Sequence, residues 1–146
     1  MKKQYLYLIL SLLCMALIFM LSAQDAVTSG ALSNKVTDTV NENTGFSFSN
    51  ETMRSIAHFL LFLLLGIFVS LWMKEQSIVH FLKPIIASFF ICVIYAVTDE
   101  IHQEFFVEGR AFELIDLAKD WSGSLLGCAA VWLKAFRKGK LRNTSR

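Results

Sequence analysis

Ionisable side chains are concentrated in one segment that directly follows an apolar run. The segment reads VTDEIHQEFFVEGR, residues 97–110, and holds Asp99, Glu100, His102 and Gln103. If a helix continues through it, Asp99, His102 and Gln103 lie at i, i+3 and i+4 and share one face. A carboxylate and an imidazole on one face could act as general base and acid or as metal ligands. A plain membrane anchor needs none of them, because an Asp at the centre of a spanning helix costs ~2.5 to 3.5 kcal/mol.

Six ionisable residues besides these lie at the starts of the second and fourth apolar runs or in the loop between the third and fourth runs, where side chains can reach a membrane–water boundary. Four of them form two pairs with helical i, i+4 spacing, one pair at the start of each of two runs. Three have an ordinary explanation: Arg54 can reach the headgroups, His58 can bond to a carbonyl, and Asp116 can be a helix N-cap. Asp120 is less easily explained. The six are Arg54, His58, Arg110, Glu113, Asp116 and Asp120.

The composition is that of an integral membrane protein. Of the 146 residues, 55% are hydrophobic and 18% are charged, with a single proline and a positive mean hydropathy. Three cysteines, Cys14, Cys92 and Cys128, all lie inside apolar runs. This placement argues against a disulfide framework or a cysteine-based zinc site.

Four apolar runs have the length of a membrane span, since about 20 helical residues cross a ~30 Å hydrocarbon core. They cover residues 4–23, 52–73, 84–104 and 117–136. We therefore predict an all-α polytopic membrane protein, a four-transmembrane-helix bundle that forms one domain. A cleaved secretory signal is the alternative for the first run, but the run is longer than the usual ~7 to 15 residues.

Two features of the predicted helices concern their ends and their packing. Asn50 or Thr52 is expected to cap the second span. In the fourth span, Gly123 and Gly127 form a small-residue strip that predicts close approach by another helix.

The polar segment 25–51 is too hydrophilic to span and is predicted to be an external loop. Apolar residues at spacings of four or five allow a short interfacial helix over about 26–40. A solvated connector is the favoured interpretation, and residues 41–50, rich in Asn, are expected to be loop.

The basic residues divide unevenly between the two sides of a four-span protein, ten on the side of the termini and four on the other. The positive-inside rule then places both termini in the cytoplasm and every candidate site residue at the external face. We expect the basic tail, 137–146, to meet anionic lipid and not nucleic acid. The ten are Lys2, Lys3, Lys74, Lys83, Lys134, Arg137, Lys138, Lys140, Arg142 and Arg146.

Five short motifs can be compared with a known family. They are F-x-x-S-x-Q at 19–24, R-x-x-x-H-F at 54–59, D-E-x-H-Q at 99–103, G-R at 109–110 and D-x-x-x-D-x-x-G at 116–123. In this order, over nearly the whole chain, they resemble the VanZ-like family of bacterial integral membrane proteins.

The resemblance implies a small multi-pass protein of the bacterial plasma membrane. The family's namesake is linked to reduced susceptibility to teicoplanin-type glycopeptides, and the family as a whole implies no settled reaction. One departure is Glu108, which stands before Gly109 where a proline is common. It puts the rigidity of that loop in question.

Three hypotheses follow for the charged residues at the external face; the second is described in the next paragraph. In the first hypothesis, these residues bind a lipid headgroup, a lipid-linked cell-wall precursor or a glycopeptide, with arginines as partners of phosphate or carboxylate. In the third hypothesis, the charges only fix the order of the helices through ion pairs. The binding residues of the first hypothesis are Arg54, Gln103, Arg110, Glu113, Asp116 and Asp120.

The second hypothesis is an enzyme that acts on a lipid or a lipid-linked precursor. Asp99 or Glu100 would be the general base, and His102 and His58 would be acid–base groups or ligands of a divalent cation. The pattern lacks the i, i+4 histidine pair of a zincin helix.

Overall fold

The computed structural model describes residues 2–23, 26–45, 47–76, 82–107 and 109–144, and in the helical stretches 26–33, 50–51 and 138–144 and at residues 44 and 82 it describes the backbone alone. This part of the chain is all-helical and contains no strand, as predicted. Its helices are α1 (Lys3–Ser22), α2 (Ala26–Thr44), α3 (Asn50–Gln76), α4 (Leu82–Phe106) and α5 (Leu114–Thr144).

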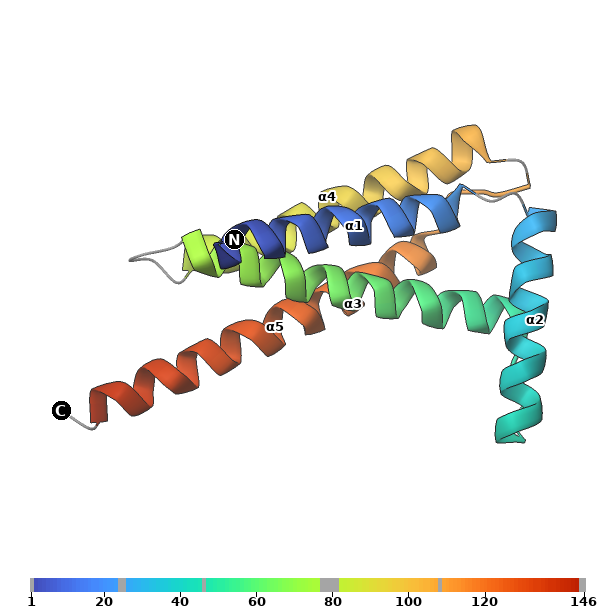
Figure 1. Cartoon of the computed structure of the whole chain (residues 1–146). Helices are drawn as coiled ribbons and strands as arrows, with labels where there is room; N and C mark the ends of the chain where they lie inside the picture. Colours follow the sequence, from blue (N-terminus) through green and yellow to red (C-terminus); the bar gives the residue numbers. More distant parts are fainter. Residues whose placement is uncertain (1, 24–25, 46, 77–81, 108, 145–146) are drawn as a thin grey trace.

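Four of the helices run lengthwise, and α2 lies across one end of them (Figure 1). The C-terminal ends of α1 and α4 and the N-terminal ends of α3 and α5 are at the α2 end. Both chain termini lie toward the opposite end, where α5 diverges from the other helices. The topology therefore brings the candidate site residues of three helices to the same end of the bundle.

Three helices are long and apolar enough to cross a membrane, over Lys3–Ser22, Thr52–Gln76 and Lys83–Phe106. These match the first three predicted spans: the first is shifted by one residue, and the second and third are each extended by three. Helix α5 is not among these helices, because every stretch of 18 residues in it contains at least three charged residues. The fourth span stays a prediction.

The favoured interpretation of 25–51 as a connector was wrong, because α2 continues as a helix to Thr44. Asn41 does not break this helix. Its side chain accepts a hydrogen bond from the backbone N–H of Phe48 (2.9 Å) and donates one to the Phe48 carbonyl (3.3 Å). The helix ends instead at Gly45, whose φ of 71° is a left-handed conformation that glycine adopts at little cost.

The predicted caps were displaced by one or more residues. Helix α3 is capped by Ser49, whose Oγ accepts the backbone N–H of Thr52 at 3.1 Å, so neither Asn50 nor Thr52 is the cap. Helix α5 begins at Leu114, which puts Asp116 in its first turn. The Asp116 carboxylate is thus available for side-chain contacts.

The core lies between α1, α3 and α4. Ile18 of α1, Phe62 and Leu65 of α3, and Cys92 of α4 are fully buried against one another. The Tyr95 hydroxyl donates a hydrogen bond to the Met15 carbonyl of α1 at 2.6 Å. Such a bond ties two apolar helices together where lipid offers no competing acceptor.

Helices α3 and α5 approach each other most closely at three glycines. A Cβ added at Gly66 would lie 2.5 Å from the Ser124 carbonyl oxygen, and one added at Gly127 would overlap the Leu63 carbonyl oxygen. Gly123 meets the Phe59 carbonyl oxygen in the same way. The predicted close approach along Gly123 and Gly127 is confirmed, and it fixes α5 on the face of α3.

Candidate functional site

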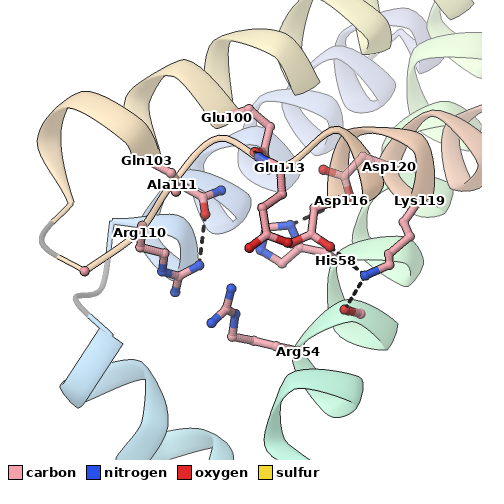
Figure 2. A pocket seen from close by; sticks show the side chains of 12 residues that line it. Arg54, His58, Glu100, Gln103, Arg110, Ala111, Glu113, Asp116, Lys119 and Asp120 are labelled. Atoms are coloured by element: carbon pink, nitrogen blue, oxygen red, sulfur yellow. Dashed lines mark hydrogen bonds and ion pairs between the residues drawn. The ribbon is translucent and has the colours of Figure 1, made fainter.

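A cavity of about 310 Å³ lies at the α2 end of the bundle (Figure 2). Eight of the ten candidate site residues line it, and Asp99 and His102 do not. The lining residues are Arg54, Ser55, His58, Glu100, Gln103, Gly109, Arg110, Ala111, Glu113, Asp116, Lys119 and Asp120.

The connection between α4 and α5 brings Arg110 over the cavity. Gly109 has a φ of 75°, which a residue with a side chain adopts only under strain. The turn lets the backbone N–H of Arg110 reach the Val107 carbonyl at 3.3 Å. Glu108, where the family often has proline, lies outside the described residues.

A chain of hydrogen bonds connects α1 to this loop. Ser22 donates to Asp99 Oδ2 at 2.7 Å, and Gln103 Nε2 donates to the same oxygen at 3.0 Å. Gln103 Oε1 accepts from the Arg110 guanidinium at 2.9 Å. Asp99 is only 3% exposed and lies behind Gln103, so it positions the Arg110 partner and does not itself face the cavity.

Ser22 was missed as a site residue, although it belongs to the 19–24 motif. Its i, i+3 relation to Phe19 gave no sign that it would face Asp99, which is 77 positions away in the chain. Gln24 of the same motif lies outside the described residues.

His102 does not line the cavity; like Asp99, which accepts a hydrogen bond from Ser22, it lies against α1. Three residues advance a helix by about 300°, which places His102 about 60° from Asp99 and 100° from Gln103. Its ring packs against Phe19 (centroids 4.6 Å apart) and stacks on Phe106 (5.5 Å). A direct role of His102 in chemistry at the cavity is therefore unsupported.

The α5 side of the cavity carries an ion pair that the sequence analysis did not include. Lys119 Nζ lies 2.6 Å from Asp116 Oδ1 and donates to Ser55 Oγ of α3 at 2.9 Å. The i, i+3 spacing of Asp116 and Lys119 was the available signal. The pair is about one-third exposed and links α5 to α3 beside the cavity.

Asp120 is completely buried and lies near His58. His58 Nδ1 is 3.8 Å from Asp120 Oδ1, an ion-pair distance if the imidazole is protonated but too long for a hydrogen bond. Within the described part of the chain, neither carboxylate oxygen of Asp120 has a hydrogen-bond partner. Glu100, by contrast, accepts the backbone N–H of Glu113 at 3.1 Å.

Two guanidinium groups point into the same space, Arg54 from α3 and Arg110 from the loop (Figure 2). Burial lowers the pKa of Arg110, and the positive charge of Arg54 lowers it further. Among the described residues, Arg54 has no carboxylate within ion-pair distance and no hydrogen-bond partner for its side chain. Two like charges held together, one of them unpaired, favour an anion between them.

The described residues contain no group of three or more His, Cys, Asp or Glu side chains arranged to hold a metal ion. The divalent cation considered in the second hypothesis thus gains no support from the geometry. The same hypothesis also loses His102 as an acid–base group at the cavity.

Comparison with known proteins gives a family match. The family model described as VanZ/LLP1 matches residues 7–135. Neither the comparison with curated proteins nor that with solved structures gave a match. The matched region contains every residue of the cavity lining.

Proposed function

Because this chain belongs to the VanZ/LLP1 family, and its charged residues line one cavity at the end of apolar helices, we propose that it binds an anionic group of a cell-envelope component. The candidates are the phosphate of a lipid headgroup or of a lipid-linked cell-wall precursor. On this proposal the protein is a multi-pass protein of the bacterial plasma membrane, with the cavity at the external leaflet.

One observation carries this proposal: Arg54 and Arg110 line one cavity although they repel each other. Nearby carboxylates offset part of this repulsion at Arg110, and an anion bound between the two guanidinium groups would offset more of it. Arginine suits this role because its planar fork of N–H donors matches the oxygens of phosphate and carboxylate. A purely structural ion pair would instead have placed a carboxylate against Arg54.

The cavity volume favours a headgroup over a larger ligand. About 310 Å³ is near the lower end of the range of small-molecule sites, ~300 to 1,000 Å³. A phosphate-bearing headgroup or the end of a precursor fits this space, and a whole glycopeptide does not. An effect on susceptibility to teicoplanin-type glycopeptides would then arise through the envelope component that is bound.

Binding to Arg54 can be tested with the full chain in phosphatidylcholine nanodiscs, titrated with dihexanoyl-phosphatidylglycerol. We expect Arg54→Gln to weaken binding by about 10- to 100-fold, since a hydrogen bond to a charged group contributes ~1.5 to 3 kcal/mol. Arg137→Gln is the matched control, because Arg137 is exposed on α5 and does not line the cavity. Equal affinities of the wild type and Arg54→Gln would reject the proposal.

We further propose four spans with both termini in the cytoplasm. The charge asymmetry of the loops supports this orientation. The close packing of α5 on α3 supports a fourth span. Gly123 and Gly127 of α5 lie against the backbone of α3, and α3 is long and apolar enough to cross a membrane. The charged residues at the start of α5 would then lie at headgroup depth.

Thiol labelling of intact cells tests this orientation. The native cysteines are buried, which keeps the background low. We expect a membrane-impermeant maleimide to label Glu113→Cys and to leave Lys74→Cys unlabelled until the cells are opened. Labelling of Lys74→Cys alone would invert the protein and place the cavity in the cytoplasm.

A further inference from the structure

We propose that the ligand of the cavity is zwitterionic and carries a primary ammonium group beside its anionic group, as a phosphoethanolamine headgroup does. This inference rests on the proposed function and adds the chemical class of the ligand. It starts from the acidic residues, since four carboxylates line the same cavity as the two arginines. They are those of Glu100, Glu113, Asp116 and Asp120.

Asp120 gives the strongest indication of a cationic group. Its side chain is 0% exposed, lines the cavity, and has no hydrogen-bond partner for either oxygen among the described residues. A buried carboxylate that accepts no hydrogen bond is costly. His58 Nδ1 lies 3.8 Å from Asp120 Oδ1, which is an ion-pair distance but too long for a hydrogen bond. An ammonium group with three N–H donors supplies the missing contacts.

The other cations of the cavity do not reach Asp120. Lys119 is engaged by Asp116 and by Ser55. Arg110 is held by Gln103 on the α4 side. In Figure 2 the guanidinium groups of Arg54 and Arg110 lie toward the loop and the start of α3, and Asp120 lies toward α5.

The two ends of the cavity therefore favour opposite charges. Glu100, Asp116 and Asp120 line the same cavity, so the acids form one cluster. A ligand with phosphate alone would be attracted by the arginines and repelled by this cluster. A ligand with a phosphate and a primary ammonium a few bonds apart places each charge beside its opposite. A quaternary ammonium would fit less well, because it has no N–H to donate.

The experiment compares two lipids that differ in the ammonium group. The full chain in phosphatidylcholine nanodiscs is titrated with dihexanoyl-phosphatidylethanolamine and with dihexanoyl-phosphatidylglycerol. We expect the wild type to bind the ethanolamine lipid about tenfold more tightly, the effect of one charge-assisted hydrogen bond. Asp120→Asn should bring the affinities for the two lipids close to parity. A preference that survives Asp120→Asn, or no preference in the wild type, overturns the inference.

A second variant keeps the test valid if Asp120→Asn does not fold. Glu113 is exposed at the cavity rim, so Glu113→Gln should leave the fold intact. We expect it to reduce the preference for the ethanolamine lipid two- to threefold, since a partly solvated charge contributes less. An unchanged preference in this variant counts against the ammonium.

These titrations distinguish this inference from the proposed function, and one further titration identifies the source of the ligand. If Arg54→Gln weakens the binding of both lipids equally and the wild type shows no preference, the proposal of anion binding stands and the proposal of an ammonium group is rejected. If Arg54→Gln changes neither affinity, both proposals fail. Soluble O-phosphoethanolamine that binds as tightly as the lipid assigns the site to a free compound, whereas much weaker binding assigns it to a membrane lipid.

Discussion

The double variant Gly123→Ala/Gly127→Ala is expected to unfold at a clearly lower temperature than the wild type. Each added Cβ would overlap a backbone carbonyl of α3, at Phe59 and Leu63, and a backbone group cannot rotate away. Overpacking costs ~1 to 3 kcal/mol at each site. Alanine favours the helix over glycine by ~0.8 to 1 kcal/mol per residue, so a net loss appears only if the helices are as close as described.

Thermal unfolding in detergent, followed by size-exclusion chromatography, measures this effect. Ala130→Val is the control, since Ala130 is exposed on the same helix and its added methyl groups meet no neighbouring helix. The expected order is a large loss for the glycine variant and little change for the control. A glycine variant more stable than the wild type would show that helix propensity, and not contact with α3, dominates at this strip.

Asp99→Leu is expected both to destabilise the protein and to weaken anion binding. Leucine has a similar size but accepts no hydrogen bond, so the buried Ser22 hydroxyl and Gln103 amide lose their shared acceptor. An unsatisfied buried donor costs ~1 to 3 kcal/mol. Without Asp99, Gln103 is free to turn, and Arg110 loses its fixed partner on the α4 side.

The variant Asp99→Asn distinguishes the role of the Asp99 side chain as a hydrogen-bond acceptor from the role of its negative charge. The asparagine oxygen can still accept from Ser22 and Gln103, so this variant should lose less stability and keep most of its affinity for phosphatidylglycerol. We expect thermal unfolding and nanodisc titration to place it between the wild type and Asp99→Leu. Equal losses in the two variants would mean that the negative charge of Asp99, and not its hydrogen bonds, holds Arg110 in position.

The sequence alone was sufficient to predict the four lengthwise helices and most of the cavity lining, but not α2. An apolar run of about 20 residues has few alternatives to a membrane-spanning helix, and the bounds of α1, α3 and α4 lie close to those of the apolar runs. Arg54, His58, Glu100 and Asp120 meet at one end of the bundle because consecutive helices run in opposite directions. The number and direction of the helices thus decide which helix ends lie together, even before the packing is known.

Other features depended on angles and contacts that spacing does not specify. His102 was expected to act at the same site as Glu100 and Gln103, but its ring packs against Phe19 and does not line the cavity. Asn41 was interpreted as a helix breaker, but the Phe48 backbone satisfies its side chain and α2 continues past it. Ser22 became part of the site only because α1 packs against the end of α4. Long-range contacts of this kind leave no local pattern in the sequence.

The central claim is that Arg54 and Arg110 hold an anionic headgroup between them. Native mass spectrometry of the protein, released from nanodiscs that contain phosphatidylethanolamine and phosphatidylglycerol, tests this claim most directly. We expect the wild type and Arg137→Gln to retain a bound phospholipid and Arg54→Gln/Arg110→Gln to retain none. Equal retention by all three proteins would contradict the claim.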